Sequence, residues 1–258
     1  MTRRADIMPN PKPAADIPLA PDTLDRLRGA STSTIATLLH KKGFRTCYIQ
    51  GVLPLSAGAR MIGPAFTLRY IAAREDTDPL EAFREPDHPQ RVAVETCPEG
   101  HVLVMDCRQD ASAASAGSIL LTRLEVRGAA GVVTDGGVRD AEGARALTMP
   151  VFAAKPSAPT NLTRHHAIDI DVPISCGGAA VYPGDIILGD GDGVMVIPRH
   201  LADELAAAAA PMEEFEAFVL EEVRAGCPVI GLYPPTDPAT LDRFATWQQA
   251  VRGEPIEG

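Results

Sequence analysis

The hydrophobic pattern predicts that two short helices open the folded part of the chain. Residues 22–28 are amphipathic with helical spacing. A cluster of serines and threonines beginning at Ser31 supplies N-caps for a second helix, which runs toward Lys42 and ends at Gly43. Residues 65–71 then carry the aromatic and β-branched side chains that are typical of a strand.

The middle of the chain has the pattern of a β-α-β unit. Residues 102–106 (VLVMD) are apolar on both faces, as in a strand buried within a sheet. Residues 116–127 have helical spacing, and residues 131–134 (GVVT) form a second short strand. A tight turn is predicted at 135–137, followed by a short helix over 140–147. This order of elements is typical of α/β proteins.

The second half of the chain contains a predicted antiparallel meander and a closing helix. Residues 168–198 are rich in Val, Ile, Gly and Pro, which indicates short strands joined by turns. Residues 201–225 have helical composition, and Pro211 is expected to kink or split that helix. We predict an α/β fold in which helices flank a central mixed sheet.

Three segments are expected from the distribution of proline and periodicity. Residues 1–21 contain five prolines and no periodicity, so they are interpreted as a tail or subunit-contact arm. Residues 22–235 are predicted to form a single α/β domain that carries the function, and residues 236–258 a C-terminal extension.

Composition and charge narrow the class of partner. Of 258 residues, 24 are basic and 34 acidic, for a net charge of −10 without a Lys/Arg-rich run, which argues against nucleic-acid binding. No run approaches the roughly 18 apolar residues of a membrane span. Five cysteines without a CxxC pair indicate a reducing compartment. With no apolar leader near the N-terminus, we expect a cytoplasmic protein.

Two features point to a site that holds an anion and a metal. The small residues 114–120 lie at a helix start, where unpaired N–H groups favour a carboxylate or phosphate. Arg139 and Asp140 follow the predicted glycine turn, so a guanidinium could bind an oxygen beside a carboxylate that ligates Mg²⁺ or Mn²⁺. Taken alone, the Arg-Asp pair could equally be a helix cap or a surface ion pair.

Several motifs in fixed order resemble a known family. GVVTDGGVRD at 131–140, PGD at 183–185 and DGVMVIP at 192–198 are similar to the family of regulator of ribonuclease activity A. That family includes the 4-hydroxy-4-methyl-2-oxoglutarate/4-carboxy-4-hydroxy-2-oxoadipate aldolases, and the resemblance extends over residues 31–235. It implies a layered β/β/α fold and a homotrimer or homohexamer with sites between subunits.

The resemblance also implies an activity. It indicates a class II pyruvate aldolase, which uses a divalent cation, Mg²⁺ or Mn²⁺, and no Schiff base, often with oxaloacetate decarboxylase activity. The substrate would be a 2-keto acid. By position in the family's motif, Arg139 would bind the keto oxygen and Asp140 the cation. The pyruvyl carboxylate would lie on the backbone amides of Gly117, Ser118, Ile119 and Leu120.

The chain departs from the family pattern where a catalytic base is expected. Ser118 and Thr37 occupy positions at which aldolase relatives often have an acidic residue. By residue type, the candidates to move a proton are then Asp110 and the pair His165-His166.

A polar insertion is expected to shape the distal part of the substrate pocket. It includes these residues: Arg69, Arg74, Glu75, Asp76, His88, Pro89, Gln90 and Arg91.

Two alternatives to the aldolase remain open. A dehydratase or hydratase of a 2-keto-3-deoxy sugar acid needs the same enolate stabilised with a different proton donor. A non-catalytic regulator that binds a ribonuclease would use the same fold without chemistry. The joint presence of Gly117, Arg139 and Asp140 favours catalysis, because a pure binding module needs no anion-binding helix start beside a metal ligand.

Overall fold

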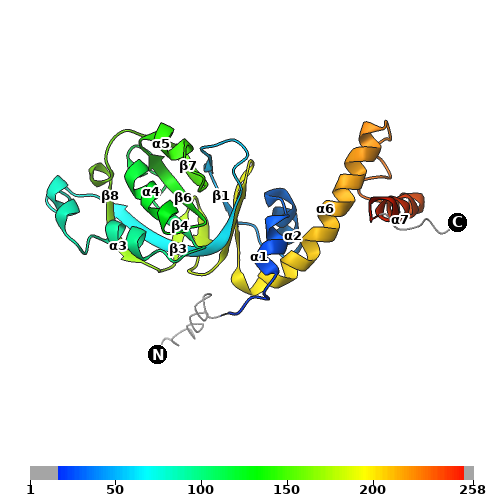
Figure 1. Cartoon of the computed structure of the whole chain (residues 1–258), viewed down its shortest axis with the longest axis horizontal. Helices are drawn as coiled ribbons and strands as arrows, with labels where there is room; N and C mark the ends of the chain where they lie inside the picture. The colour runs from blue at the N-terminus through cyan, green and yellow to red at the C-terminus, as the bar shows by residue number, and fades with distance from the viewer. Residues whose placement is uncertain (1–16, 253–258) are drawn as a thin grey trace, which may run out of the picture.

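The structure, a computed structural model, describes residues 17–252. A mixed β-sheet lies at its centre (Figure 1). Its strands follow the order β1-β12-β11-β3-β4-β6-β7-β2, with β5 added beside β6 and β8 beside β3. Strands β3, β4, β6 and β7 are parallel, and the flanking strands are antiparallel. A separate hairpin, β9-β10, packs close to β4. The predicted α/β class with a central mixed sheet is confirmed.

The strands are β1 (Tyr48–Ile49), β2 (Leu53–Pro54), β3 (Met61–Ala72), β4 (Val102–Asp106), β5 (Ala114–Ala116), β6 (Gly131–Val138), β7 (Val151–Pro156), β8 (His165–Ile170), β9 (Ile174–Cys176), β10 (Ala179–Val181), β11 (Ile186–Asp190) and β12 (Gly193–Ile197). The helices are α1 (Thr23–Arg28), α2 (Thr32–Lys41), η2 (Leu80–Arg84), α3 (Pro89–Thr96), α4 (Ser118–Val126), α5 (Ala141–Arg145), η3 (Asn161–Thr163), η4 (Arg199–Leu201), α6 (Ala202–Arg224) and α7 (Pro238–Arg252). The two predicted opening helices, the strand over 102–106 and the antiparallel strands after residue 168 all form.

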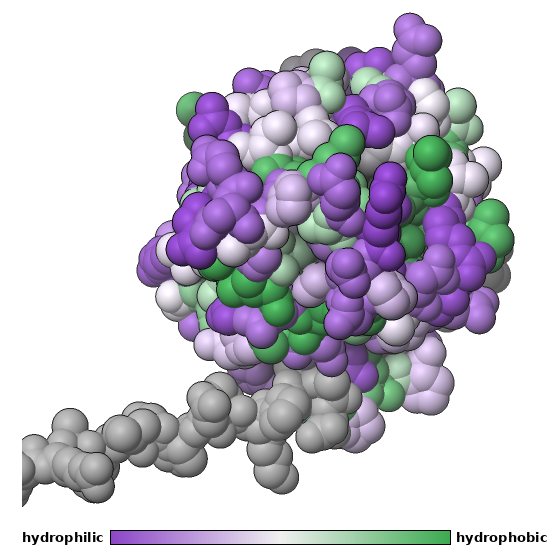
Figure 2. All heavy atoms as spheres, turned by 90° about the vertical axis from the view of Figure 1, so that its left-hand side faces the viewer, coloured by the Kyte–Doolittle hydropathy of each residue, from purple (hydrophilic) through white to green (hydrophobic). Residues whose placement is uncertain are grey.

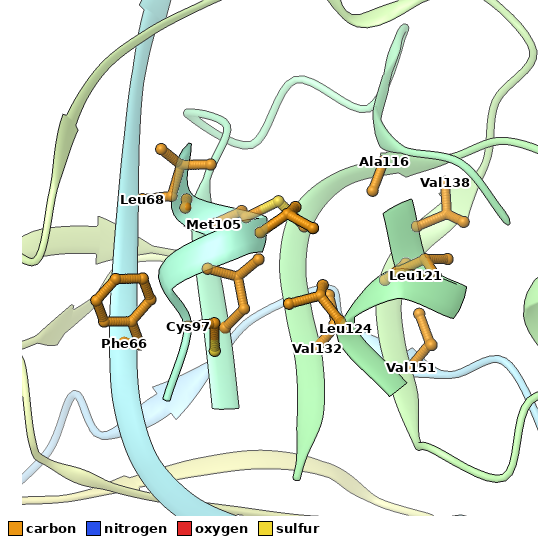
Figure 3. Close-up of a cluster of buried hydrophobic side chains, with 14 of the residues drawn as sticks. Phe66, Leu68, Cys97, Met105, Ala116, Leu121, Leu124, Val132, Val138 and Val151 are labelled. Carbon is orange, nitrogen blue, oxygen red and sulfur yellow. The ribbon is translucent and has the colours of Figure 1, made fainter. Parts of the chain in front are cut away.

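One hydrophobic core lies between the parallel strands and helices α3, α4 and α5. Leu68, Met105 and Val132 from the sheet belong to the same buried cluster as Leu121 and Leu124 of α4 (Figure 3). Burying side chains of this size contributes about 1.5–3 kcal/mol each. This core fixes α4, whose first turn borders the candidate site.

Two further cores hold the rest of the sheet. On the opposite face, Val104 and Phe152 pack against the β9-β10 hairpin through Ile174 and Cys176. Helices α1, α2 and α6 cover β11 and β12 through a third cluster of buried apolar residues. Helices and strands therefore form layers, and the parallel strands lie in the middle of them.

Helix α6 continues through Pro211, so the prediction of a split helix is wrong. An internal proline removes a backbone hydrogen bond and costs about 3 kcal/mol. Packing on both sides of Pro211 offsets this cost. Before it, Leu205 is buried in the cluster formed with α1, α2, β11 and β12, and after it, Phe218 is buried against Phe244 and Trp247 of α7. The distal half of α6 extends away from the sheet together with α7 (Figure 1).

The prediction of a tight turn at residues 135–137 is also wrong, because strand β6 continues through these residues to Val138. Its glycines provide close packing instead of a turn. A Cβ at Gly136 would lie 2.7 Å from the Cys107 sulfur, and one at Gly137 would lie 2.5 Å from the Ser157 Cβ. The pairing of β6 with β7 shifts register between Thr134 and Gly137, so a bulge replaces the expected turn.

The expected segment boundaries fall partly outside the described residues. Most of the proposed arm, residues 1–16, lies outside them, and the amide of Ala20 donates to the Asp203 carboxylate of α6 at 3.1 Å. Within residues 17–252, none of the helices combines the length and apolarity that a bilayer span requires.

Asp135 connects three segments around the bulged strand. Its buried carboxylate accepts backbone N–H groups of Cys107 at 2.6 Å, Gln109 at 3.0 Å and Gly177 at 2.9 Å. We expect Asp135→Ala to lower the free energy of unfolding by about 3 kcal/mol or more, because it leaves buried donors without an acceptor. Urea unfolding measures the change.

The exposed Asp25 is the control, because its ion pair with Arg28 is 4.0 Å long and both side chains are exposed. Asp25→Ala should change stability by less than about 0.5 kcal/mol. A loss below about 1 kcal/mol for Asp135→Ala would contradict the role assigned to its three hydrogen bonds.

Candidate functional site

A cavity of about 180 Å³ lies where β5 and β6 end and α4 begins. Residues 114–117 form one side of it, and Ile119, Leu120, Arg139 and Asp140 also line it. Carboxyl ends of parallel strands are the usual position for ligands in α/β sheets. The structure therefore brings most of the residues predicted for the site to one cavity.

The absence of a side chain at Gly117 allows two segments to meet. A Cβ built at Gly117 would lie 2.8 Å from Asp140 Oδ2 and 2.9 Å from Arg139 Cγ. The backbone also connects them, because the Arg139 amide donates to the Ala116 carbonyl at 3.1 Å. Arg139 and Asp140 thus pack directly on the residue that precedes α4.

Asp140 has an unusual backbone conformation for its residue type. Its φ of 55° lies in the left-handed region, where a residue with a Cβ is strained. Its Oδ2 accepts from both the amide and the hydroxyl of Ser118, each at 3.3 Å, and lies 3.7 Å from Arg139 Nε. Strained residues held by their surroundings are concentrated at functional sites.

In the first turn of α4, Ser118 binds Asp140, whereas Ile119 and Leu120 line the cavity. The Ser118 amide is taken by Asp140, so it is not free for a bound carboxylate in the way the family resemblance implies. Ser118 itself does not line the cavity, whereas Ile119 and Leu120 do. Amides in the first turn have no partner within the helix, and the helix dipole adds positive potential there. Ile119 and Leu120 are the better candidates to bind an anion.

The donor set fits a hard cation that keeps part of its water shell. Within residues 17–252, no group of three His, Cys, Asp or Glu side chains is placed to hold a metal. Among the described residues that line the cavity, Asp140 alone carries a carboxylate, and its side chain is 49% exposed. Mg²⁺ commonly binds through one or two carboxylates, with water and ligand oxygens completing the shell.

The three residues proposed to move a proton do not line the cavity. The Asp110 carboxylate accepts from the hydroxyl and amide of Ser112, and these hydrogen bonds lower its pKa. His165 is fully buried beside Tyr70, and burial lowers its pKa, while His166 binds Asp78. A part for Asp110 in catalysis stays a prediction.

The insertion does reach the cavity, although fewer of its residues do so than expected. Gln90 and Arg91 line it, as do Leu80 and Phe83 of η2. Arg69, Arg74, Glu75 and Asp76 do not, because their side chains are turned to surface ion pairs or solvent. Figure 2 shows the side of the molecule that carries this insertion, where hydrophobic side chains are scattered among hydrophilic ones.

Asn161 also lines the cavity, and sequence analysis missed it. It lies in η3, just before β8, and no motif singled it out as a site residue.

A buried aspartate anchors the insertion to β8. Asp78 accepts from the Arg74 amide at 2.9 Å, the Thr77 hydroxyl at 2.8 Å and His166 Nδ1 at 2.6 Å. Burial alone would raise its pKa, but these hydrogen bonds outweigh burial and the pKa is lowered. A lowered carboxylate pKa stabilises the folded form above the unfolded pKa of about 3.9, and this stabilisation is lost as pH falls through the lower folded value.

We therefore expect Asp78→Asn to loosen residues 74–88 at pH 7. Hydrogen exchange of the Arg74 amide should become about tenfold faster or more, because a hydrogen bond to a charged group is lost. The difference from wild type should shrink only as pH falls through the lowered pKa of Asp78, because Asp78 itself becomes neutral there. Asp76→Asn, at an exposed position of the same segment, is the matched control. Equal exchange rates in the two variants at pH 7 would refute this anchoring role.

Comparison with known proteins gives a consistent family assignment. A family model described as RraA-like (Aldolase/RraA) matches residues 31–196. A relative from Halalkalibacterium halodurans, named "Putative 4-hydroxy-4-methyl-2-oxoglutarate aldolase", is 34% identical over 148 residues, 57% of this chain and 64% of that protein. A relative of the same name from Burkholderia multivorans is 33% identical over 57% of this chain and 82% of that protein. The match to the first thus spans under two thirds of that relative.

A solved structure has the same fold. The Streptomyces coelicolor protein RraAS2, described as an unusual member of the RNase ES inhibitor RraA protein family, superposes with a TM-score of 0.69 at 29% identity. The match covers 78% of this chain and 97% of that one.

Proposed function

The chain belongs to the RraA-like family, and we propose that it is a divalent-metal-dependent lyase that cleaves a carbon–carbon bond in a 2-keto acid. The observation that carries the proposal is the packing of Arg139 and Asp140 on Gly117 at the edge of the cavity. Relatives named as 4-hydroxy-4-methyl-2-oxoglutarate aldolases support an aldol cleavage, and oxaloacetate decarboxylation would use the same site.

In this proposal the chain's own groups bind and orient the pyruvyl half. The amides of Ile119 and Leu120 bind its carboxylate at the positive end of α4. The Arg139 guanidinium, 45% exposed at the cavity edge, binds the keto oxygen. Cleavage beside a keto group leaves an enolate, so a fixed cationic donor stabilises the charge as it develops.

Asp140 would hold Mg²⁺ or Mn²⁺. A bound cation would act as a Lewis acid on the keto acid. Ser118 donates two hydrogen bonds to Oδ2 of Asp140, which orients the carboxylate and leaves Oδ1 for a ligand.

A non-catalytic regulator is the second candidate, favoured by the fold shared with RraAS2. The cavity argues against it, because a surface that binds a protein needs no strained aspartate against a glycine inside a cavity. A dehydratase or hydratase of a 2-keto-3-deoxy sugar acid would use the same residues and is distinguished by its products.

We further propose that the working form is a cytoplasmic homotrimer or homohexamer. Ile119 is 78% exposed and Leu80 is 66% exposed, and both line the cavity. A neighbouring subunit over these apolar side chains would cover the cavity.

Arg139→Ala and Asp140→Ala should each abolish metal-dependent pyruvate release from a 4-hydroxy-2-keto acid or oxaloacetate. Loss of one donor to a developing oxyanion lowers kcat by about 10²–10³-fold. A coupled pyruvate assay with Mn²⁺ and with chelator measures this, and circular dichroism should show unchanged folding. Arg123→Ala is the control, because Arg123 of α4 forms an exposed ion pair with Glu95 of α3. Turnover at the wild-type rate in either site variant would refute the assignment.

Gly117→Ala tests the geometry without removing a functional group. The added methyl would lie 2.8 Å from Asp140 Oδ2, so the Arg139-Asp140 pair must move. Affinity for pyruvate in the presence of Mn²⁺ should fall at least about tenfold, or about 1.4 kcal/mol, with thermal stability nearly unchanged. Gly191→Ala adds the same methyl where no atom lies within 4 Å, and it should bind normally. Normal binding by Gly117→Ala would show that the close packing is not required.

A further inference from the structure

Helix α3 forms one wall of the cavity and carries a buried side-chain amide, that of Gln90. Gln90 is 2% exposed, and its Nε2 donates to the Ser115 carbonyl at 2.5 Å. Because a carbonyl can only accept, this bond fixes the orientation of the amide. The Oε1 of Gln90 has no hydrogen-bond partner among the described residues. It is a buried acceptor beside an open cavity.

Asn161 presents a second acceptor of the same kind. It is 4% exposed, and its Nδ2 donates to the Tyr70 hydroxyl at 3.4 Å. That hydroxyl donates to the Ser115 carbonyl at 3.5 Å, and burial raises the pKa of Tyr70, so the hydroxyl keeps its proton. The Oδ1 of Asn161 has no partner within residues 17–252. Two amides, held by one network around Ser115, thus each present an oxygen that lacks a donor.

Arg91 adds a positive charge to the same wall. Its guanidinium lies 4.8 Å from the centre of the Phe83 ring, and no carboxylate of the described residues lies within ion-pair distance of it. Its Nε is buried and has no partner there. Among the lining residues, two guanidinium groups, of Arg91 and Arg139, are balanced by the single carboxylate of Asp140.

We propose that Gln90, Asn161 and Arg91 form the specificity subsite of this cavity and bind the substrate's tail beyond the pyruvyl half. The amide oxygens accept from a hydroxyl group of the tail, and Arg91 binds an acidic group on it. Buried acceptors without donors are costly, so a ligand hydroxyl that satisfies them is strongly preferred over a methyl group. This assignment of three residues to the substrate's tail rests on the proposed function.

Three ligands of equal chain length separate the two recognition elements. 2-Oxovalerate ends in a methyl group, 5-hydroxy-2-oxovalerate in a hydroxyl and 2-oxoglutarate in a carboxylate, and none of them carries the hydroxyl that aldol cleavage requires. Titration calorimetry of the full chain with saturating Mn²⁺ gives their dissociation constants. We expect wild type to bind 2-oxoglutarate about tenfold and the hydroxylated ligand about threefold more tightly than 2-oxovalerate.

The variants assign each preference to its residue. Arg91→Met keeps the side chain over Phe83 without its charge and should reduce the preference for 2-oxoglutarate to within about twofold. Gln90→Met and Asn161→Leu should each reduce the preference for the hydroxyl. Arg123→Met, a surface arginine on the adjacent helix, should leave both preferences intact.

The outcomes distinguish this inference from the function on which it rests. Unchanged preferences in Arg91→Met and in the two amide variants, with normal 2-oxovalerate binding, would overturn the tail subsite and leave the proposed function standing. If none of the three ligands binds wild type with Mn²⁺, the proposed function fails and the subsite with it. Binding of 2-oxovalerate also reports that each variant is folded at the cavity.

Discussion

The close packing of Gly117 against Arg139 and Asp140 is the constraint on which the site depends. It brings the start of helix α4 against the end of strand β6, where the Ser118 hydroxyl also donates a hydrogen bond to the Asp140 carboxylate at 3.3 Å. A methyl group at this position would fill the space between the segments. The positive helix start, the guanidinium and the carboxylate can therefore share one cavity only while this position has no side chain. The strained φ of Asp140 has the same cause, because it turns the carboxylate back toward Ser118.

The rest of the sheet holds this arrangement in place. Strand β6 reaches Val138, and Asp135 within it accepts from backbone amides of the loop after β4 and of the β9-β10 hairpin. The Ser115 hydroxyl donates to the Gly137 carbonyl at 2.9 Å and thereby ties β5 to the same strand. Arg139, two residues beyond Gly137, is thus positioned by bonds to three separate segments. A site built on such a frame needs little reorganisation when a ligand binds.

Sequence patterns predicted what depends on local composition. The apolar run at 102–106 and the small residues before Ile119 led to the correct strand and helix start, because burial and capping act over a few neighbours. The glycines at 136 and 137 were misinterpreted, since glycine serves both turns and close packing, and only the neighbouring Cys107 and Ser157 decide between them. Asn161 was missed because its contact with Tyr70 spans 91 positions, which no local pattern encodes.

The balance of charge in the cavity has a consequence for how ligands would bind. With one protein carboxylate available, a cation at Asp140 would take most of its oxygen ligands from water and from the keto acid itself. The keto acid in turn would bring negative charge to a cavity in which, among the described residues, two guanidinium groups face a single carboxylate. The keto acid would therefore supply oxygen ligands to the cation, and the cation would supply positive charge to the keto acid. Thermodynamic linkage then requires each ligand to raise the affinity for the other by the same factor. Under the proposed function, this cavity would therefore bind the metal weakly alone and more firmly together with the keto acid.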